Sequence, residues 1–194
     1  MASPSRALPN PHPQALFTHV ALLRGINVGG KNKLPMKVLV PIFAEVGCQD
    51  VTSFIQSGNV IFKAGKALAV RVPELIRAAI GRQFRLDVPV ILRSAEQLND
   101  VRRHNPFLGS TSDIRHLHVA FLAGPPKPSQ VAALDPNRSP PDRFAVRGQE
   151  VFLYLPNGVA RTKLTNAYFD AKLATTSTLR NWNTFQKLTA LLDG

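Results

Sequence analysis

The chain has 194 residues and is 44% hydrophobic, which is enough for one large domain or two small ones with a sizeable core. Its 24 Lys and Arg residues against 12 Asp and Glu give a formal net charge of +12, which favours phosphate-rich partners. A generally basic proteome would give the same balance without such a partner. A single cysteine, Cys48, excludes an intramolecular disulfide and suits a reducing cytoplasm. No apolar run reaches the roughly 20 residues that span a bilayer, so we expect no membrane contact.

The first 16 residues contain four prolines and lack the apolar centre of a signal peptide. We therefore predict a disordered leader over residues 1–16, with ordered structure from Phe17.

Hydrophobic periodicity and turn residues predict the elements that follow. The first strand covers residues 17–24, and an apolar helical stripe then runs from Met36 to Val46. Pro41 predicts a kink in that helix, or a start only near Val40. Strands at residues 51–56 and 60–63 flank a hairpin turn, and a second helix is expected to begin at Pro73. After a strand at residues 88–93, Ser94 and Gln97 form a capping box.

The second part of the chain repeats this order. Three pairs of stretches match, and they are HVALLRG (19–25) with HVAFLAG (118–124), SGNVIF (57–62) with RGQEVF (147–152), and ILRSAEQL (91–98) with TLRNWNTF (178–185). In the last pair Arg93 matches Arg180. In the hairpins Gly58 matches Gly148. The repeat predicts an α+β fold of two ferredoxin-like β-α-β-β-α-β halves, over residues 17–104 and 105–194. A glycine-rich loop at residues 25–34 is then an addition to the first half.

Several of these stretches are similar to a bacterial family, domain of unknown function 1697. The resemblance rests on ALLRGINVGGKNKLPM (21–36), IQSGNVIF (55–62), DVPVILRS (87–94), HNPF (104–107), LHVAFL (117–122), TKLTN (162–166) and LRNWNT (179–184). It implies two intertwined ferredoxin-like halves, and it implies no established activity or catalytic residues. The prolines of the leader and Pro41 depart from the family pattern.

The glycine-rich loop carries the clearest chemistry. Gly25 to Lys31 fits G-x-x-x-x-G-K, but Asn32 follows where a P-loop needs Ser or Thr. Glycine amides beside cationic side chains can still seat a phosphate, and the alternative is that the glycines serve turn geometry alone. The candidate anion-binding residues of this loop are Arg24, Gly25, Asn27, Gly29, Gly30, Lys31 and Lys33.

The second half offers two further candidate positions. Thr162 is expected to cap a helix between Arg161 and Lys163, and these cations oppose the helix dipole unless an anion is bound. Arg180, Asn181 and Trp182 offer a cation, an amide and an aromatic ring. Trp182 could stack on a base, although its spacing with Phe185 and Leu188 also suits core packing. We expect Arg24, Lys163 and Arg180 to meet in space.

Metal and cofactor sites are not indicated. His116 and His118 share one side of a predicted strand, but no third ligand follows at useful spacing. No catalytic residue can be named. The favoured hypothesis is a cytoplasmic module that binds a phosphorylated ligand, either nucleic acid or a nucleotide. The alternatives are an enzyme acting on a phosphorylated small molecule, with Asn27, Asn32 and Asn181 positioning it, and an interaction protein without a ligand. The oligomeric state is left open.

Overall fold

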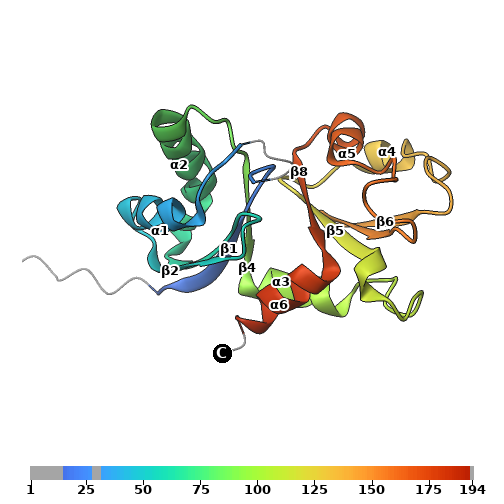
Figure 1. Ribbon diagram of the computed structural model, residues 1–194, viewed down its shortest axis with the longest axis horizontal. Helices are drawn as coiled ribbons and strands as arrows, with labels where there is room; N and C mark the ends of the chain where they lie inside the picture. Colours follow the sequence, from blue (N-terminus) through green and yellow to red (C-terminus); the bar gives the residue numbers. More distant parts are fainter. Residues whose placement is uncertain (1–14, 28–31, 193–194) are drawn as a thin grey trace, which may run out of the picture.

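The computed structural model describes residues 15–27 and 32–192 (Figure 1). Its first half consists of β1 (Phe17–Leu23), α1 (Met36–Glu45), β2 (Gln49–Phe54), β3 (Asn59–Ala64), α2 (Lys66–Phe84), β4 (Val90–Ser94) and α3 (Ala95–Arg103). Its second half consists of η1 (Ile114–His116), β5 (Leu117–Leu122), α4 (Pro128–Ala132), β6 (Arg143–Arg147), β7 (Glu150–Tyr154), α5 (Asn166–Leu173), β8 (Ser177–Asn181) and α6 (Trp182–Ala190).

Each half forms a four-stranded antiparallel sheet with the same strand order. The orders are β2-β3-β1-β4 and β6-β7-β5-β8, which is the ferredoxin-like arrangement, so the predicted fold class is confirmed. Strand pairing also confirms the match between the last strands, because His19 pairs with Ser94 as His118 pairs with Asn181.

The hairpin match is one residue out of register. The Leu23 amide donates to the Gly58 carbonyl at 2.8 Å, and the Leu122 amide donates to the Gln149 carbonyl at 2.8 Å. The residue equivalent to Gly58 is therefore Gln149. Both glycines have positive φ, but they occupy different positions of their turns, so aligning the glycines misplaces the strands.

The two sheets lie side by side between two outer groups of helices (Figure 1). Helices α1 and α2 cover the outer face of the first sheet, and α4 and α5 lie on the outer side of the second. The inner faces share one core, to which β1, β5, β7, α3 and α6 all contribute. Both faces of each sheet are covered, so the open sheet face on which some ferredoxin-like domains stack RNA bases is absent from the described chain.

Helices α3 and α6 interlock the halves. They lie side by side beneath the sheets, and α3 also contacts the hairpin of the second sheet (Figure 1). There the Arg147 Nη1 donates to the His104 carbonyl at 2.9 Å, and the Phe107 ring lies 6.5 Å from that of Tyr154. The end of the first half thus packs against the second half, as the predicted intertwining requires.

Three local predictions are wrong, and the first is the start of the second helix, since α2 begins at Lys66 with Pro73 inside it. Helix α1 begins at Met36 and contains Pro41, which confirms the predicted stripe and excludes the alternative start near Val40. The buried stripe of α2 includes Ala69 and Val72 before the proline, and this packing outweighs the lost backbone donor.

The other two concern the second half. Thr165 caps α5 by accepting a bond from the Tyr168 amide at 3.2 Å, whereas the Thr162 hydroxyl accepts from the Leu164 amide in a preceding turn. His116 belongs to η1, so it does not share a strand with His118.

Arg93, on β4, reaches from the first half into the second. Its Nη2 donates to the carbonyls of Leu122 at 2.8 Å and Gln149 at 3.0 Å, and its Nε donates to Glu150 Oε1 at 2.8 Å. One guanidinium therefore binds the end of the central strand and the hairpin turn of the other half. Its side chain is only 3% exposed.

Arg180, on β8, makes the reciprocal contact. Its Nη2 donates to the carbonyls of Leu23 at 2.9 Å and Gly58 at 3.4 Å, and its Nε donates to Asn59 Oδ1 at 2.7 Å. Asn59 stands where the second half has Glu150. Arg180 thus has an amide oxygen in place of the carboxylate, and burial lowers its pKa to about 10.

Removing either arginine should destabilise the protein far more than removing the charge of its partner. Arg93→Met and Arg180→Met leave buried carbonyls unsatisfied, and we expect each to lower the free energy of unfolding by about 3 kcal/mol or more. Glu150→Gln keeps an acceptor for Arg93, as Asn59 does for Arg180, and should cost about 1 kcal/mol. Urea denaturation measures all three, with the exposed Arg71→Met as the control. Equal losses for Arg93→Met and Arg71→Met would contradict the assignment.

Acidification should destabilise the fold through its buried histidines. Burial lowers the pKa of His118, which is 6% exposed, and that of His19 below the usual 6.5. The unfolded chain therefore binds more protons than the folded chain below that value, and stability falls as the pH drops. Urea denaturation at about pH 7.5 and about pH 5 should show this loss, with a smaller loss in His118→Gln. An unchanged pH dependence in the variant would count against His118 as a source.

Candidate functional site

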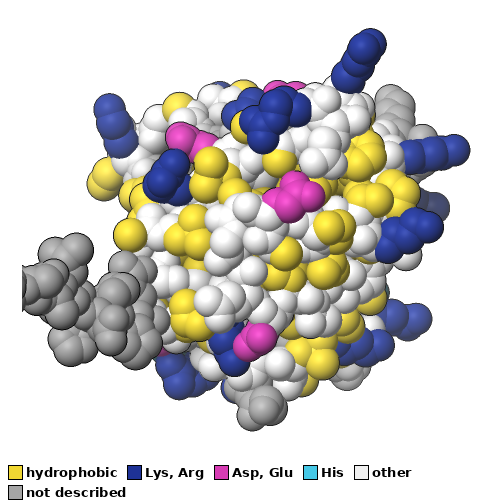
Figure 2. All heavy atoms as spheres, turned by 90° about the vertical axis from the view of Figure 1, so that its left-hand side faces the viewer, with side chains coloured by type: hydrophobic (Ala, Val, Ile, Leu, Met, Phe, Trp, Pro, Cys, Tyr) yellow, Lys and Arg dark blue, Asp and Glu magenta, His cyan; other side chains and the backbone are white. Residues whose placement is uncertain are grey.

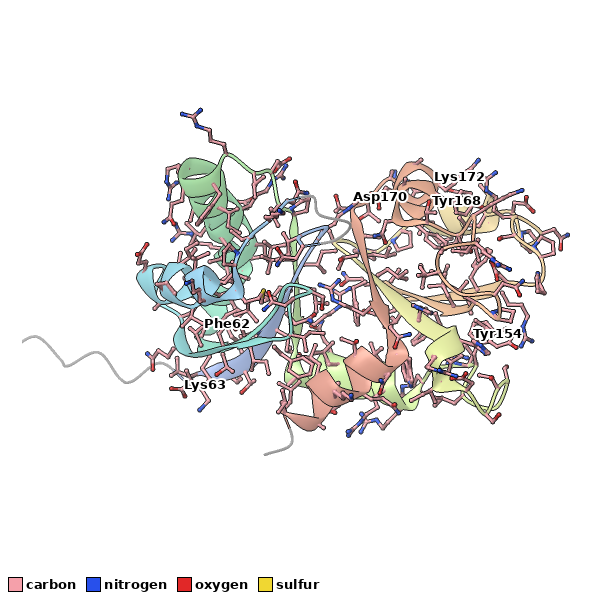
Figure 3. All side chains as sticks on the ribbon, in the orientation of Figure 1. Phe62, Lys63, Tyr154, Tyr168, Asp170 and Lys172 are labelled. Atoms are coloured by element: carbon pink, nitrogen blue, oxygen red, sulfur yellow. The ribbon has the colours of Figure 1, made fainter. Side chains whose placement is uncertain are left out.

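Arg24, at the end of β1, is neutralised within the protein. Its Nη1 donates to Asp170 Oδ2 on α5, across the boundary between the halves, and Figure 3 shows Asp170 at this edge of α5. The other oxygen of Asp170 accepts bonds from the Ser177 amide at 2.8 Å and hydroxyl at 2.7 Å. The cation predicted to bind a phosphate therefore joins the two halves.

The described ends of the glycine-rich loop are closed by side-chain amides. Asn27 accepts a bond from the Leu34 amide at 2.9 Å and donates to the Gln56 carbonyl at 3.0 Å. The Asn32 Nδ2 donates to the Gly25 carbonyl at 3.0 Å. Gly25 adopts a φ of +66°, which favours glycine in a turn. These amides hold the described ends of the loop, and a role for them in positioning a substrate stays a prediction.

Part of this prediction lies outside the described residues, namely Gly29, Gly30 and Lys31. Lys33 is described and exposed. Anion binding by the loop stays a prediction. Arg24 is not one of its free cations, because it is paired with Asp170.

Two of the predicted ligand-binding residues lie in the interior. Arg180 is 6% exposed and all its donors point into the protein. Trp182 is 0% exposed and packs on Phe185 with ring centroids 4.8 Å apart, so it cannot stack on a base. These two predictions are wrong, because burial in the shared core leaves a ligand no access to either side chain.

Asn181 and Lys163 have their own contacts in the second half. Asn181 caps α6 by accepting a bond from the Asn183 amide at 3.0 Å, and it donates to the Arg115 carbonyl at 3.1 Å. Lys163 is exposed before α5, where its amide donates to Ser139 Oγ at 3.0 Å. The Arg180 side chain reaches the Leu23 carbonyl, next to Arg24 in the chain. Asn181 is the last residue of β8, and its side chain contacts His118. Burial thus removes Arg180 and Trp182 from an accessible joint site, and a meeting of Lys163 with the loop stays a prediction.

A surface that the sequence predictions missed lies along the edge strand β6. We call it the arginine–aromatic face and define it by Arg143, Arg147, His104, Phe107 and Tyr154. The Arg143 guanidinium carbon lies 4.9 Å from the centroid of the Tyr154 ring and 5.4 Å from that of Phe107. Arg147 is held by its bond to the His104 carbonyl. Both arginines are exposed, so their cationic groups are oriented and accessible.

The alternation of β6 explains this arrangement. Phe144 and Val146 pack into the outer core of the second half, so Arg143 and Arg147 project to the opposite side. Four residues of strand separate the two arginines by about 13 Å. The pattern RFAVR carried this signal in the sequence. Its partners His104 and Phe107 follow a helix of the first half, which no local pattern could indicate.

A cleft between α3 and the β6–β7 hairpin adjoins this face. Two cavities of about 380 and 240 Å³ share Asp100, Val101 and Glu150 among their lining residues. The carboxylates are engaged, since Asp100 Oδ1 lies 3.0 Å from the Nδ1 of His104 and Glu150 binds Arg93. The cleft has charges of both signs, and we assign no nucleophile to it.

A second arginine–tyrosine contact lies at the same end of the molecule. The Arg138 guanidinium carbon is 5.0 Å from the Tyr168 ring centroid, and the Tyr168 hydroxyl accepts a bond from the Asp135 amide at 3.0 Å. Figure 3 shows Tyr154, Tyr168 and Lys172 all on the second half, at the right of the view.

Metal and membrane chemistry find no support in the described part of the chain. Within residues 15–27 and 32–192, no three His, Cys, Asp or Glu side chains are grouped to hold a metal ion. None of the helices described is long and apolar enough to cross a membrane.

Comparison with known proteins gives a family and a fold. The model of the family described as "Protein of unknown function (DUF1697)" matches residues 16–152. No curated protein matches. A solved structure of the conserved bacterial protein SP0830 from Streptococcus pneumoniae is similar over 92% of this chain and 99% of that chain, with 23% identity and a TM-score of 0.70. At this identity the likeness supports the fold alone.

The Arg24–Asp170 pair should be worth less than the hydrogen bonds of the same carboxylate. Both side chains are about one-quarter exposed, at 26% and 24%, so Arg24→Ala should cost about 0.5–1 kcal/mol. Asp170→Ala also leaves the buried Ser177 amide without its acceptor and should cost about 2 kcal/mol. A double-mutant cycle by urea denaturation separates the ion pair from the Ser177 bonds. A larger loss for Arg24→Ala than for Asp170→Ala would reverse this ranking.

Proposed function

Because the chain belongs to the DUF1697 family, whose description states no activity, we propose its function from geometry: the protein binds nucleic acid through the arginine–aromatic face. The observation that carries the proposal is the stack of Arg143 on Tyr154 and Phe107. A guanidinium held over aromatic rings keeps one accessible face on which a base can stack, while its charge attracts phosphate.

The cations of this face are not neutralised by carboxylates. No ion pair of Arg143 or Arg147 occurs within residues 15–27 and 32–192, and the nearby acids Asp100 and Glu150 are bound to His104 and Arg93. Two fixed cations about 13 Å apart can neutralise phosphates of one backbone. The net charge of +12 would add long-range attraction.

Other faces support the proposal less well. Figure 2 shows the face made by the outer helices of the first half, where Lys and Arg side chains stand mainly around the rim and the middle is mostly uncharged with an acidic side chain. The predicted loop loses Arg24 to Asp170. The face along β6 is therefore the better surface for a polyanion.

A cytoplasmic location is part of the same proposal. Cys48 is buried among core residues, and burial raises the pKa of its thiol to about 11. A buried, protonated thiol is inert in a reducing compartment.

Binding of a fluorescent single-stranded oligonucleotide should depend steeply on salt and on the two arginines. Fluorescence anisotropy at about 50 to 300 mM salt should give a log affinity that falls linearly with log salt concentration. Arg143→Ala/Arg147→Ala should weaken binding and reduce the slope by about 1.4, the value expected for two phosphate contacts with a single strand.

The matched control is Arg71→Ala/Arg82→Ala, which removes the same charge from exposed positions of α2. Equal weakening by both double variants would show that only net charge matters. No binding by the unaltered protein at the lowest salt would refute the proposal.

A further inference from the structure

The internal repeat produces two equivalent places where the end of a central strand meets the other half, and we call them seams. The residues at the two seams differ. The Arg24 amide donates to the Pro89 carbonyl at 2.9 Å, and the Ala123 amide donates to the Thr176 carbonyl at 2.8 Å. Ala123 therefore occupies in the second half the position that Arg24 occupies in the first. One seam has an arginine side chain available to cross it, and the other has a methyl group.

In the first seam the arginine meets a carboxylate on a helix of the opposite half. Arg24 binds Asp170 of α5, and Asp170 in turn binds Ser177 at the start of β8. The guanidinium is thus an observed occupant of this type of seam.

In the second seam a cavity of about 130 Å³ remains. Ala123 and Thr176 line one side, and Pro73, Glu74 and Arg77 of α2 line the other together with the start of β4. Glu74 makes no ion pair within the described residues 15–27 and 32–192. Arg77 is matched, because its Nη2 donates to Asp87 Oδ2 at 2.8 Å and its Nε to the other oxygen.

We propose that this second seam binds a small organic cation, a guanidinium or primary ammonium group on a short apolar stem. Glu74 supplies the unmatched carboxylate, as Asp170 does for Arg24. Pro73, Pro89, Val90 and Ile91 supply apolar walls for the stem.

Charge selects a cation over an anion here. The two charges of Arg77 and Asp87 cancel, and Glu74, an exposed residue that lines the cavity, adds a negative charge at its edge. A phosphate or carboxylate would meet that charge at close range and would be repelled. The site adjoins α2 of the first half and shares no residue with the arginine–aromatic face. The two proposals can therefore be tested independently.

Calorimetric titration with ethylguanidine tests the site, and ethylurea serves as the neutral ligand of the same shape. We expect saturable binding of ethylguanidine by the full chain, at least about tenfold weaker binding of ethylurea, and a similar loss in Glu74→Gln. Glu45→Gln removes an exposed helical carboxylate of α1 that does not line the cavity, and it should leave binding unchanged.

A second variant tests the seam without a ligand. Ala123→Arg places a guanidinium where the first seam has Arg24, so it should raise the melting temperature and abolish ethylguanidine binding. Glu74→Gln added to Ala123→Arg should remove the gain in melting temperature. Absence of ethylguanidine binding in the unaltered protein, binding that survives Glu74→Gln, or a lower melting temperature for Ala123→Arg would each overturn the proposal.

Discussion

Two buried guanidinium groups hold the molecule together. The Nε and Nη2 donors of Arg93 and Arg180 find their acceptors in the half to which the arginine does not belong. Taking such a group out of water costs several kcal/mol unless its donors are satisfied, and these donors are satisfied only when both halves are in place. Each half therefore depends on the other for the stability of its last strand. The shared core beneath the sheets adds the apolar part of the same dependence.

The candidate binding surfaces all depend on the contacts between the two halves. The Arg24–Asp170 ion pair and the cavity beside Ala123 both lie at the boundary between the halves that Arg93 and Arg180 hold together. The arginine–aromatic face combines strand β6 with the segment that follows α3, since Arg143 stacks on Phe107 as well as on Tyr154. Neither half alone would form it. Both proposed sites therefore lie where the two halves differ from each other.

Much of the fold could be predicted from the sequence because it is encoded locally. The capping box at Ser94 and the match of Arg93 with Arg180 needed only short stretches, and both are confirmed. The hairpin match failed because glycine marks a turn without fixing which residue faces the neighbouring strand. The candidate site was predicted poorly for a different reason. Arg180 looked like a free cation, but its partner Asn59 lies 121 residues away in the chain, beyond any local pattern. The spacing of Trp182 with Phe185 and Leu188 predicted core packing, and this is confirmed, whereas its assignment as a ligand-binding residue is wrong.

The reciprocal arginines also bear on synthesis. A ribosome releases the chain from its amino end, and the first sheet is complete once β4 has emerged. At that moment the carbonyl of Leu23 still lacks its bond from Arg180, which is made more than one hundred residues later. Arg93 has likewise emerged before Leu122 and Gln149 exist. The nascent first half therefore carries the guanidinium of Arg93 and the carbonyl of Leu23 without their protein partners until the second half has been translated. Strand β8, which supplies Arg180, then completes the contacts of the first sheet.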